Sequence, residues 1–350
     1  MPVNLPPAET NVLLLYDFDP QWTSEEKEEV SNAHARLTEH LSAAGLCVDL
    51  LPVVDHHFPQ KLSSFDSEAC VLFNWCDGIP GYKHSEWLVA HHLEQMRFIF
   101  TGSSSATLAL SYEKHRVKEI LDRQKVPTPR WQLYASSSSN GWHDFPAIVK
   151  PAIGHCSEWV TSESVAVNEK ELKDRICYLV DGVGVPALVE DFIDGREFHV
   201  SLWGNGRVEM LPPAEMDFSA LNDVHDRLCS FDAKFMPGSV HYENIHTVIP
   251  GTLDGDERAE LERVCRAAYK AIGCRDYGRI DLRLRNGIFY VLDINPNPDI
   301  SEDASMASAA EFAGYSYGEM AGYLIALAAK RHPVFGRKTR QAAIEPRFLN

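Results

Sequence analysis

The chain has 350 residues, a formal net charge of −17 at pH 7 and a hydrophobic content of 45%. A chain of this length buries a sizeable core and is expected to divide into two or three domains. The acidic balance argues against a broad surface for nucleic acid or for an anionic membrane, so any bound phosphate group needs local cations.

The eight cysteines show no CxxC pair and no metal-finger spacing. The first ten residues lack the pattern of a secretory leader, and no apolar run is long enough to span a membrane. These features predict a cytoplasmic protein with reduced thiols.

The first hundred residues alternate short apolar strands with helices. Strands are predicted at 12–16, 47–51 and 69–74. The run Thr23-Ser-Glu-Glu is a capping box for a helix that continues to Gly45, and a second helix at 87–96 leads to a strand at 97–100. This alternation predicts a mostly parallel sheet. No G-x-G-x-x-G follows the first strand, which argues against a dinucleotide site.

A second segment begins after the small polar residues at 101–105 and contains a predicted helix at 112–124. Further along, an apolar strand ends in Lys150 and is followed by a polar turn at 154–157. A lysine at the end of a buried strand, beside such a turn, suits neutralisation of phosphate. The alternative is a lysine that extends from the strand end into solvent.

A strand–turn–strand pattern covers residues 187–201 and places Glu190 and Glu197 on either side of a loop. The backbone of this loop has the donors and acceptors to bind an adenine edge. The carboxylate of Glu197 is suited to the hydroxyls of a ribose.

The most informative pattern is a pair of strands at 280–284 and 288–293 that carry polar residues within apolar runs. Asp281 lies on the first strand, and Asp293 and Asn295 lie at the end of the second. Buried carboxylates are usually paired with a cation or a metal. Two carboxylates and an amide oxygen form a hard-oxygen site suited to Mg²⁺, which commonly bridges to nucleotide phosphates.

The register of this hairpin decides whether one metal can touch both carboxylates. A plain two-residue Asn286-Gly287 loop places Asp281 opposite Leu292 and turns Asp293 to the other side of the sheet. We therefore expect a loop with an odd number of residues and a bulge at the glycine. The alternative is an exposed edge hairpin whose acids lie in water.

Six segments carry a resemblance that spans residues 101–331. They are Thr101-Gly-Ser with Tyr112-Glu-Lys114, Ile148-Val-Lys150-Pro-Ala, Val189-Glu-Asp-Phe-Ile-Asp-Gly-Arg-Glu197, Phe231-Asp-Ala-Lys234-Phe, Gly278-Arg-Ile-Asp281 and Leu292-Asp-Ile-Asn295. In order and spacing, the chain resembles the ATP-grasp enzymes of the D-alanine–D-alanine ligase-like superfamily. The resemblance implies an α/β fold of the α+β ATP-grasp kind, with an N-terminal parallel-sheet domain followed by two α+β lobes that clasp ATP.

The resemblance also implies a role for each matching residue. It implies nucleotide contacts from Lys114, Lys150, Cys156 and Ser157 at the phosphates, from Glu190 and Ile193 at the adenine, and from Glu197 at the ribose. It implies that Asp281, Asp293 and Asn295 hold Mg²⁺, with Mn²⁺ as an alternative ion. It implies two catalytic residues, Arg279 at the tetrahedral intermediate and Lys234 on a loop that closes over the phosphates.

The sequence departs from the family where the amino-acid substrate would bind. The glycine-rich first turn of cell-wall ligases is replaced by Tyr16-Asp-Phe-Asp-Pro-Gln-Trp22, and Asp293 stands where a glutamate is usual. The His155-Cys-Ser157 turn replaces a Gly-Ser-Ser loop, and Pro298-Asp299 replaces a Pro-Gly pair. We therefore expect the ATP-binding half to be kept and the amino-acid half to be changed.

The expected activity is an ATP-dependent carboxylate–amine ligase, which forms an amide- or imine-type C–N bond through an acyl-phosphate. It would join an amino acid to a small non-cell-wall carboxylate or natural-product substrate. The alternatives are a divergent D-alanine–D-alanine ligase and an ATP-binding scaffold without turnover. Small-molecule substrates, no nucleic acid and no membrane are expected as partners, and a homodimer is compatible with the resemblance.

The expected domain division follows the matching segments. Residues 1–110 form the N-terminal domain, 111–190 the central lobe and 191–335 the C-terminal lobe with the Mg²⁺ site. The remaining residues, 336–350, form a tail.

Overall fold

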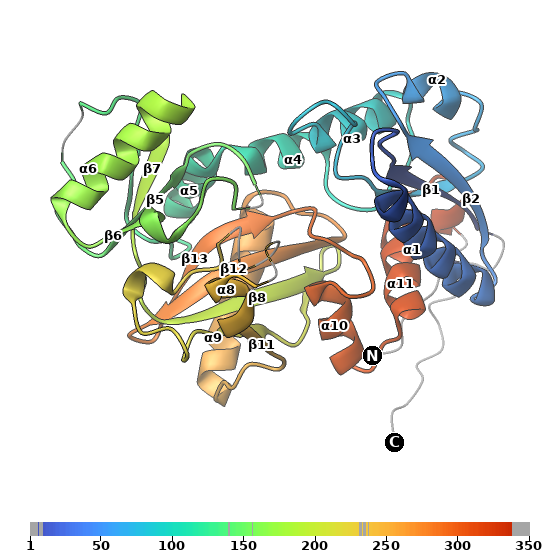
Figure 1. The fold of residues 1–350 in the computed structure, drawn as a ribbon. Helices are drawn as coiled ribbons and strands as arrows, with labels where there is room; N and C mark the ends of the chain where they lie inside the picture. Colours follow the sequence, from blue (N-terminus) through green and yellow to red (C-terminus); the bar gives the residue numbers. More distant parts are fainter. Residues whose placement is uncertain are drawn as a thin grey trace.

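The computed structural model describes residues 6, 10–138, 141–155, 157–230, 233, 236 and 238–337 (Figure 1). Figure 1 shows the N-terminal part at one end of the molecule, a small green lobe at the other, and a larger sheet between and below them.

The N-terminal part is a parallel sheet in the order β2-β1-β3. Its elements are β1 (Asn11–Asp17), α1 (Ser24–Ala43), β2 (Cys47–Val53), α2 (Phe58–Leu62), β3 (Val71–Trp75) and α3 (Glu86–Gln95). The predicted capping box is present, because the Thr23 hydroxyl accepts from the Glu26 amide and the Glu26 carboxylate accepts from the Thr23 amide. The parallel sheet expected from the alternating pattern is confirmed.

The strand predicted at 97–100 is wrong. Arg97 leaves α3 in the left-handed conformation, at a φ of 62°, and of this segment only Phe100 forms a bridge, to Leu72. Residues 97–100 therefore connect α3 to the following segment, and they contribute one bridge to the sheet.

Two helices connect the N-terminal part to the rest of the chain, where one was predicted. They are α4 (Ser105–Tyr112) and α5 (Lys114–Arg123). Glu113 separates them with a non-helical backbone (φ −94°, ψ 78°). The Lys114 amide then donates to the Ala152 carbonyl at 2.9 Å, so the start of α5 is fixed against the end of a strand in the next lobe.

The small lobe is an antiparallel sheet in the order β4-β7-β5-β6, covered by one helix. Its elements are β4 (Trp131–Tyr134), β5 (Ala147–Pro151), the 3-10 turn Ser162–Ser164, β6 (Val165–Ala166), α6 (Glu169–Cys177), the π-helical segment Tyr178–Val183 and β7 (Ala187–Asp191).

The larger sheet has the strand order β11-β10-β8-β12-β13, with β9 paired to β8. Its elements are β8 (Arg196–Trp203), β9 (Glu209–Met210), β10 (Ala214–Asp217), the 3-10 turn Val224–Asp226, α8 (Val240–Asn244), β11 (His246–Val248), α9 (Gly255–Ala271), β12 (Tyr277–Arg285) and β13 (Ile288–Asn295). Apolar side chains on one face, such as Phe198 and Ile280, pack against Leu261 and Val264 of α9. The other face is therefore left for polar residues.

Two C-terminal helices return to the N-terminal sheet. They are α10 (Ser305–Phe312) and α11 (Tyr317–Ala329), and Figure 1 shows α11 beside α1. Leu324 and Ile325 of α11 belong to the same core as Val12 and Leu14 of β1. The domain boundaries at residues 110, 190 and 335 stay a prediction. Within the described ranges, none of the helices combines the length and the apolar character that a membrane crossing requires.

Candidate active site

Polar side chains occupy alternate positions on the face of the larger sheet that α9 does not cover. On β12 they are Arg279, Asp281 and Arg283, and opposite them on β8 lie, in register, Ser201, His199 and Glu197. Because successive side chains of a strand point to opposite faces, these six residues share one face. The intervening residues Ile280 and Leu282 are fully buried in the core.

The hairpin that follows β12 has a two-residue loop. Arg285 pairs with Ile288, and Asn286 and Gly287 both have a positive φ, of 55° and 76°. These dihedrals are those of the primed turn that joins two twisted strands most tightly. The prediction of a longer loop with an odd number of residues is therefore wrong for this hairpin.

The two carboxylates nevertheless lie opposite each other, because the register changes inside the strand. Leu282 pairs with Val291 and Asp281 pairs with Asp293, which leaves Leu292 as the extra residue of a β-bulge. The bulge returns Asp293 to the same face as Asp281. A register correction was predicted, and the structure places it five residues beyond the turn glycine.

Each of these carboxylates is paired with a cation. The Lys114 ammonium donates to Asp293 at 2.7 Å, and Arg279 donates to both oxygens of Asp281, at 2.8 and 3.0 Å. Burial by itself would raise the pKa of Asp293, but Lys114 and Lys150 hold it well below its usual range. Asp293 is therefore ionised at neutral pH. Although β13 lies at the edge of the sheet, both carboxylates are held in ion pairs, which is not the alternative of acids that lie in water.

The donor set fits Mg²⁺. Asp281 and Asp293 supply hard carboxylate oxygens from facing positions, and Asn295 follows on the same strand as Asp293. The Asn295 carboxamide oxygen accepts from the Asn297 amide at 3.0 Å, so it already has one partner within the chain.

Lys150 is buried at the end of β5 and does not extend into solvent. Its ammonium lies 2.9 Å from Glu190 Oε1 and 3.4 Å from the Leu292 carbonyl oxygen. Burial would lower the pKa of Lys150, but Glu190 and Asp293 together hold it above its ordinary value.

Sequence reasoning missed Lys118, which lies 3.3 Å from Glu190 Oε2. Its spacing of four residues from Lys114, on one face of α5, was the available signal.

Lys118 is almost fully buried, and burial lowers its pKa to about 8 although Glu190 opposes that change. It donates to the Thr128 hydroxyl at 2.6 Å and to the Val291 carbonyl at 3.1 Å. The carboxylate of Glu190 is therefore held between two lysines.

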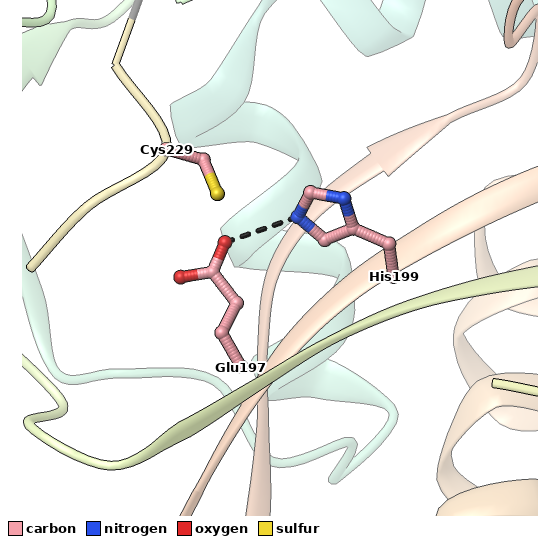
Figure 2. Close-up of side chains that lie close together, drawn as sticks. All are labelled: Glu197, His199 and Cys229. Carbon is pink, nitrogen blue, oxygen red and sulfur yellow. Dashed lines mark hydrogen bonds and ion pairs between the residues drawn. The ribbon is translucent and has the colours of Figure 1, made fainter. Parts of the chain in front are cut away.

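Glu197 is held by Arg283 and His199. Arg283 Nε donates to Glu197 Oε2 at 2.7 Å, and Oε1 lies 3.0 Å from His199 Nε2 (Figure 2). Burial raises the pKa of Glu197, but Arg283 and His199 outweigh it and keep this pKa well below the usual range. Arg283 also donates to the Ile193 carbonyl at 3.0 Å. Arg283 was not predicted as a site residue from the sequence. The available signal was its position two residues after Asp281 on β12, which places both side chains on the same face of the sheet.

A pocket of about 880 Å³, including its open mouth, lies between the two antiparallel sheets. Of the predicted site residues, it is lined by Lys114, Lys150, Ser157, Glu190, Ile193, Glu197, Asp281 and Asp293. Apolar side chains, among them Ile148, Phe192 and Leu292, line the same space. Arg279 and Asn295 do not line it, although Arg279 reaches it through Asp281. The predicted residues Cys156 and Lys234 lie outside the described residues.

A second set of polar groups connects this pocket to the N-terminal part. Glu86 accepts from the Asn297 amide group at 3.2 Å, and its other oxygen lies 4.0 Å from His155 Nε2. Burial raises the pKa of Glu86 to about 7, and the charge of Asp77 adds to that rise. Burial, aided by Lys114, lowers the pKa of His155 to about 4, so its ring is neutral. Sequence reasoning missed Glu86, since nothing local distinguishes it from other acids at helix starts.

Two antiparallel sheets that enclose a pocket, with buried lysines on one side and facing carboxylates on the other, define an ATP-grasp fold. The comparisons with known proteins agree. Residues 123–326 match the family model described as the D-ala D-ala ligase C-terminus. The chain belongs to this family, and it is an ATP-grasp ligase of the class that forms C–N bonds.

Relatives cover most of the chain. It is 31% identical over 265 residues to the uncharacterized protein y4sG of Sinorhizobium fredii, which covers 75% of each chain. It is 27% identical over 233 residues to a D-alanine–D-alanine ligase of a Marinomonas species, covering 65% of this chain and 68% of that protein.

A solved structure has the same fold. The D-alanine–D-alanine ligase of Bacillus anthracis, complexed with ATP, matches 95% of this chain and 100% of its own, with a TM-score of 0.70 and 17% identity. The predicted fold class is thereby confirmed. ATP-dependent ligases of this family use ATP and Mg²⁺ in general.

Proposed function

We propose that this chain is an ATP-dependent carboxylate–amine ligase that joins an amino acid to a small carboxylate outside cell-wall synthesis. The observation that carries the proposal is the pocket in which Lys114 and Lys150 face Asp281 and Asp293. A polyphosphate needs fixed cations, and the metal that accompanies it needs hard anionic ligands. Both sets are present within one partly closed space.

ATP would lie between the two antiparallel sheets. Its phosphates would meet Lys114, Lys150 and the turn that contains Ser157, and its adenine would meet the backbone near Glu190 and Ile193. The apolar residues that line the same space suit the faces of a base. The Glu197 carboxylate would accept hydrogen bonds from the ribose hydroxyls, and Arg283 fixes the orientation of that carboxylate.

The resident cations are paired with carboxylates, and nucleotide binding would redistribute these pairs. The phosphates would compete with Asp293 for Lys114, which frees an oxygen of Asp293 for Mg²⁺. The ion would be held by Asp281, Asp293 and Asn295, with Mn²⁺ as an alternative, and would offset the charge that develops on the transferred phosphoryl group.

The reaction has two steps. An oxygen of the substrate carboxylate attacks the γ-phosphorus of ATP, which yields an acyl-phosphate and ADP. The amine nitrogen then attacks the acyl carbon, phosphate leaves, and the nitrogen loses its proton. Arg279, which donates two hydrogen bonds to Asp281, would bind the tetrahedral oxyanion. The catalytic role of Lys234, which lies outside the described residues, is proposed from the resemblance alone.

The region proposed to bind the carboxylate and amine substrates, near the end of β1, carries aromatic and acidic side chains. Phe18 and Trp22 follow β1 and their ring centroids lie 6.0 Å apart, edge to face. The Asp17 carboxylate accepts from the Asp77 amide, and Glu86 lies 4.0 Å from His155, a residue that lines the nucleotide pocket. An acidic and aromatic surface of this kind suits an ammonium group on a molecule larger than D-alanine.

The proposal also includes the domain division at residues 110, 190 and 335, a homodimer in solution, and a cytoplasmic location. The location is supported by the free thiols of cysteines such as Cys47, Cys70 and Cys265.

The test is a phosphate-release screen in which single amino acids are paired with small carboxylates in the presence of Mg²⁺ and ATP. We expect release only when a larger carboxylate accompanies the amino acid, and little or none with D-alanine alone. Steady formation of the D-alanine dipeptide would replace this proposal with a divergent D-alanine–D-alanine ligase. The absence of ADP with every pair would point to a scaffold without turnover.

A further inference from the structure

Three side chains of different chemistry converge at one edge of the nucleotide pocket. Glu197 and His199 lie two residues apart on the same face of β8, and Cys229 comes from the segment that precedes α8. Their ligand atoms, a carboxylate oxygen, an imidazole nitrogen and a thiol sulfur, all lie within 4.8 Å of one another. Figure 2 shows the sulfur of Cys229 pointing towards the carboxylate of Glu197 and the ring of His199.

The three side chains are held in place by neighbours. The side chains of Glu197 and His199 are only 6% and 10% exposed. Arg283 binds Glu197 through Oε2, which leaves Oε1 as the oxygen that faces His199 and Cys229. The Ser157 hydroxyl donates to the Cys229 carbonyl oxygen at 3.2 Å and fixes the backbone that carries the thiol.

Sulfur, imidazole nitrogen and carboxylate oxygen are the ligands that Zn²⁺ takes in proteins. Metal–ligand distances of about 2.0–2.3 Å place neighbouring ligands of a tetrahedral site roughly 3.3–3.8 Å apart, so small side-chain rotations would close the cluster on an ion. All three residues line the pocket, which leaves a fourth position open to a small molecule. The site differs in kind from Asp281 and Asp293, whose oxygens suit Mg²⁺ and not a soft ion.

We propose that Glu197, His199 and Cys229 form a binding site for a soft divalent cation of the zinc type, and that an ion bound there inhibits ATP binding. The ion would take Glu197 Oε1, the oxygen available to a ribose hydroxyl. Zinc and ATP would therefore compete for the same pocket edge. The inhibition rests on the proposed function, whereas the binding of the ion does not.

The binding is tested with the full-length protein, freed of metal by a chelator and titrated with Co²⁺ alone. We expect a thiolate-to-cobalt charge-transfer band and the intense visible bands of tetrahedral cobalt, both of which saturate at one ion per chain. Cys229→Ser should abolish the charge-transfer band, and His199→Gln should weaken binding. Outer partners of a metal site alone contribute about 10- to 100-fold in affinity, so the loss of a direct ligand should exceed tenfold. Cys47→Ser, which alters an exposed cysteine of β2, is the matched control and should change neither.

The inhibition is tested by measuring ATP affinity with and without Zn²⁺ at saturating Mg²⁺. The zinc concentration that halves ATP binding should rise more than tenfold in Cys229→Ser relative to Cys47→Ser. A cobalt spectrum without a thiolate band, or one that survives Cys229→Ser, overturns the site and leaves the proposed ligase function untouched. Cobalt binding that leaves ATP affinity unchanged overturns the inhibition, and with it the ribose role of Glu197.

Discussion

Glu86 should lower the stability of the fold at neutral and alkaline pH. Burial, together with the charge of Asp77, raises the pKa of this carboxyl from its ordinary 4.5 to about 7, although the Asn297 hydrogen bond opposes the rise. Below pH 4.5 both the folded and the unfolded protein carry the proton, so the group has no effect. Between the two pKa values the unfolded chain ionises first, and the free energy of unfolding falls as the pH rises.

The magnitude follows from those two pKa values. Their difference of about 2.5 corresponds to about 3 kcal/mol of unfolding free energy once the pH is well above 7. A glutamine keeps the shape of the side chain and an acceptor for Asn297, but it has no charge to bury. Glu86→Gln should therefore stabilise the protein by about 3 kcal/mol at pH 8.5, and by less than about 1 kcal/mol at pH 5.

The assay is urea unfolding of both proteins at pH 5 and pH 8.5, followed by fluorescence. Glu29→Gln, which removes the same charge from the exposed surface of α1, is the matched control and should show no such pH-dependent gain. The same Glu86→Gln protein should lose turnover if this carboxylate meets the substrate ammonium, so stability and activity should change in opposite directions. An equal effect of Glu86→Gln on stability at the two pH values would refute the reasoning.

Three other predictions concern the nucleotide pocket and the contact between distant parts of the chain. Lys150→Ala should weaken ATP binding about 10- to 100-fold by calorimetry, since a charge-assisted contact contributes about 1.5–3 kcal/mol, and unchanged affinity would remove Lys150 from the phosphate site. Asp281→Asn should abolish Mg²⁺-dependent ADP formation and leave the circular dichroism spectrum unchanged. The control Asp256→Asn, on the exposed start of α9, should keep ADP formation. Near-normal turnover of Asp281→Asn at low millimolar Mg²⁺ would contradict the role of Asp281 as a metal ligand. Arg331→Met should lower the free energy of unfolding by about 3 kcal/mol, because Arg331 is paired with the fully buried carboxylate of Asp276, and a loss below about 1 kcal/mol would show that this pair contributes little.

Much of the fold could be predicted from local sequence, because the determining interactions are local. The capping box at Thr23 uses residues three apart, and the strands of the N-terminal sheet are short apolar runs between helices. The helices α4 and α5 were predicted less well. The break between them at Glu113 depends on the hydrogen bond from the Lys114 amide to the Ala152 carbonyl, and Ala152 lies far along the chain.

The candidate site was predicted as a set of residue types, but its geometry was not. Lys114, Lys150, Asp281 and Asp293 were identified from their motifs, and all four line one pocket. The bulge at Leu292 was misplaced because hairpin signals specify the turn, whereas the change of register depends on the contacts of the whole strand.

What the sequence by itself determined is the class of protein: the order of its motifs fixes an ATP-grasp ligase. What only the tertiary structure decided is which charged groups meet. Glu190 lies between two lysines, Glu86 lies beside Asn297, and Cys229 faces His199. Most of these partners are separated by dozens of residues or more, so no local pattern encodes their contact. The packing of the sheets around the pocket brings them together, and burial then raises the pKa of Glu86 and lowers that of Lys118.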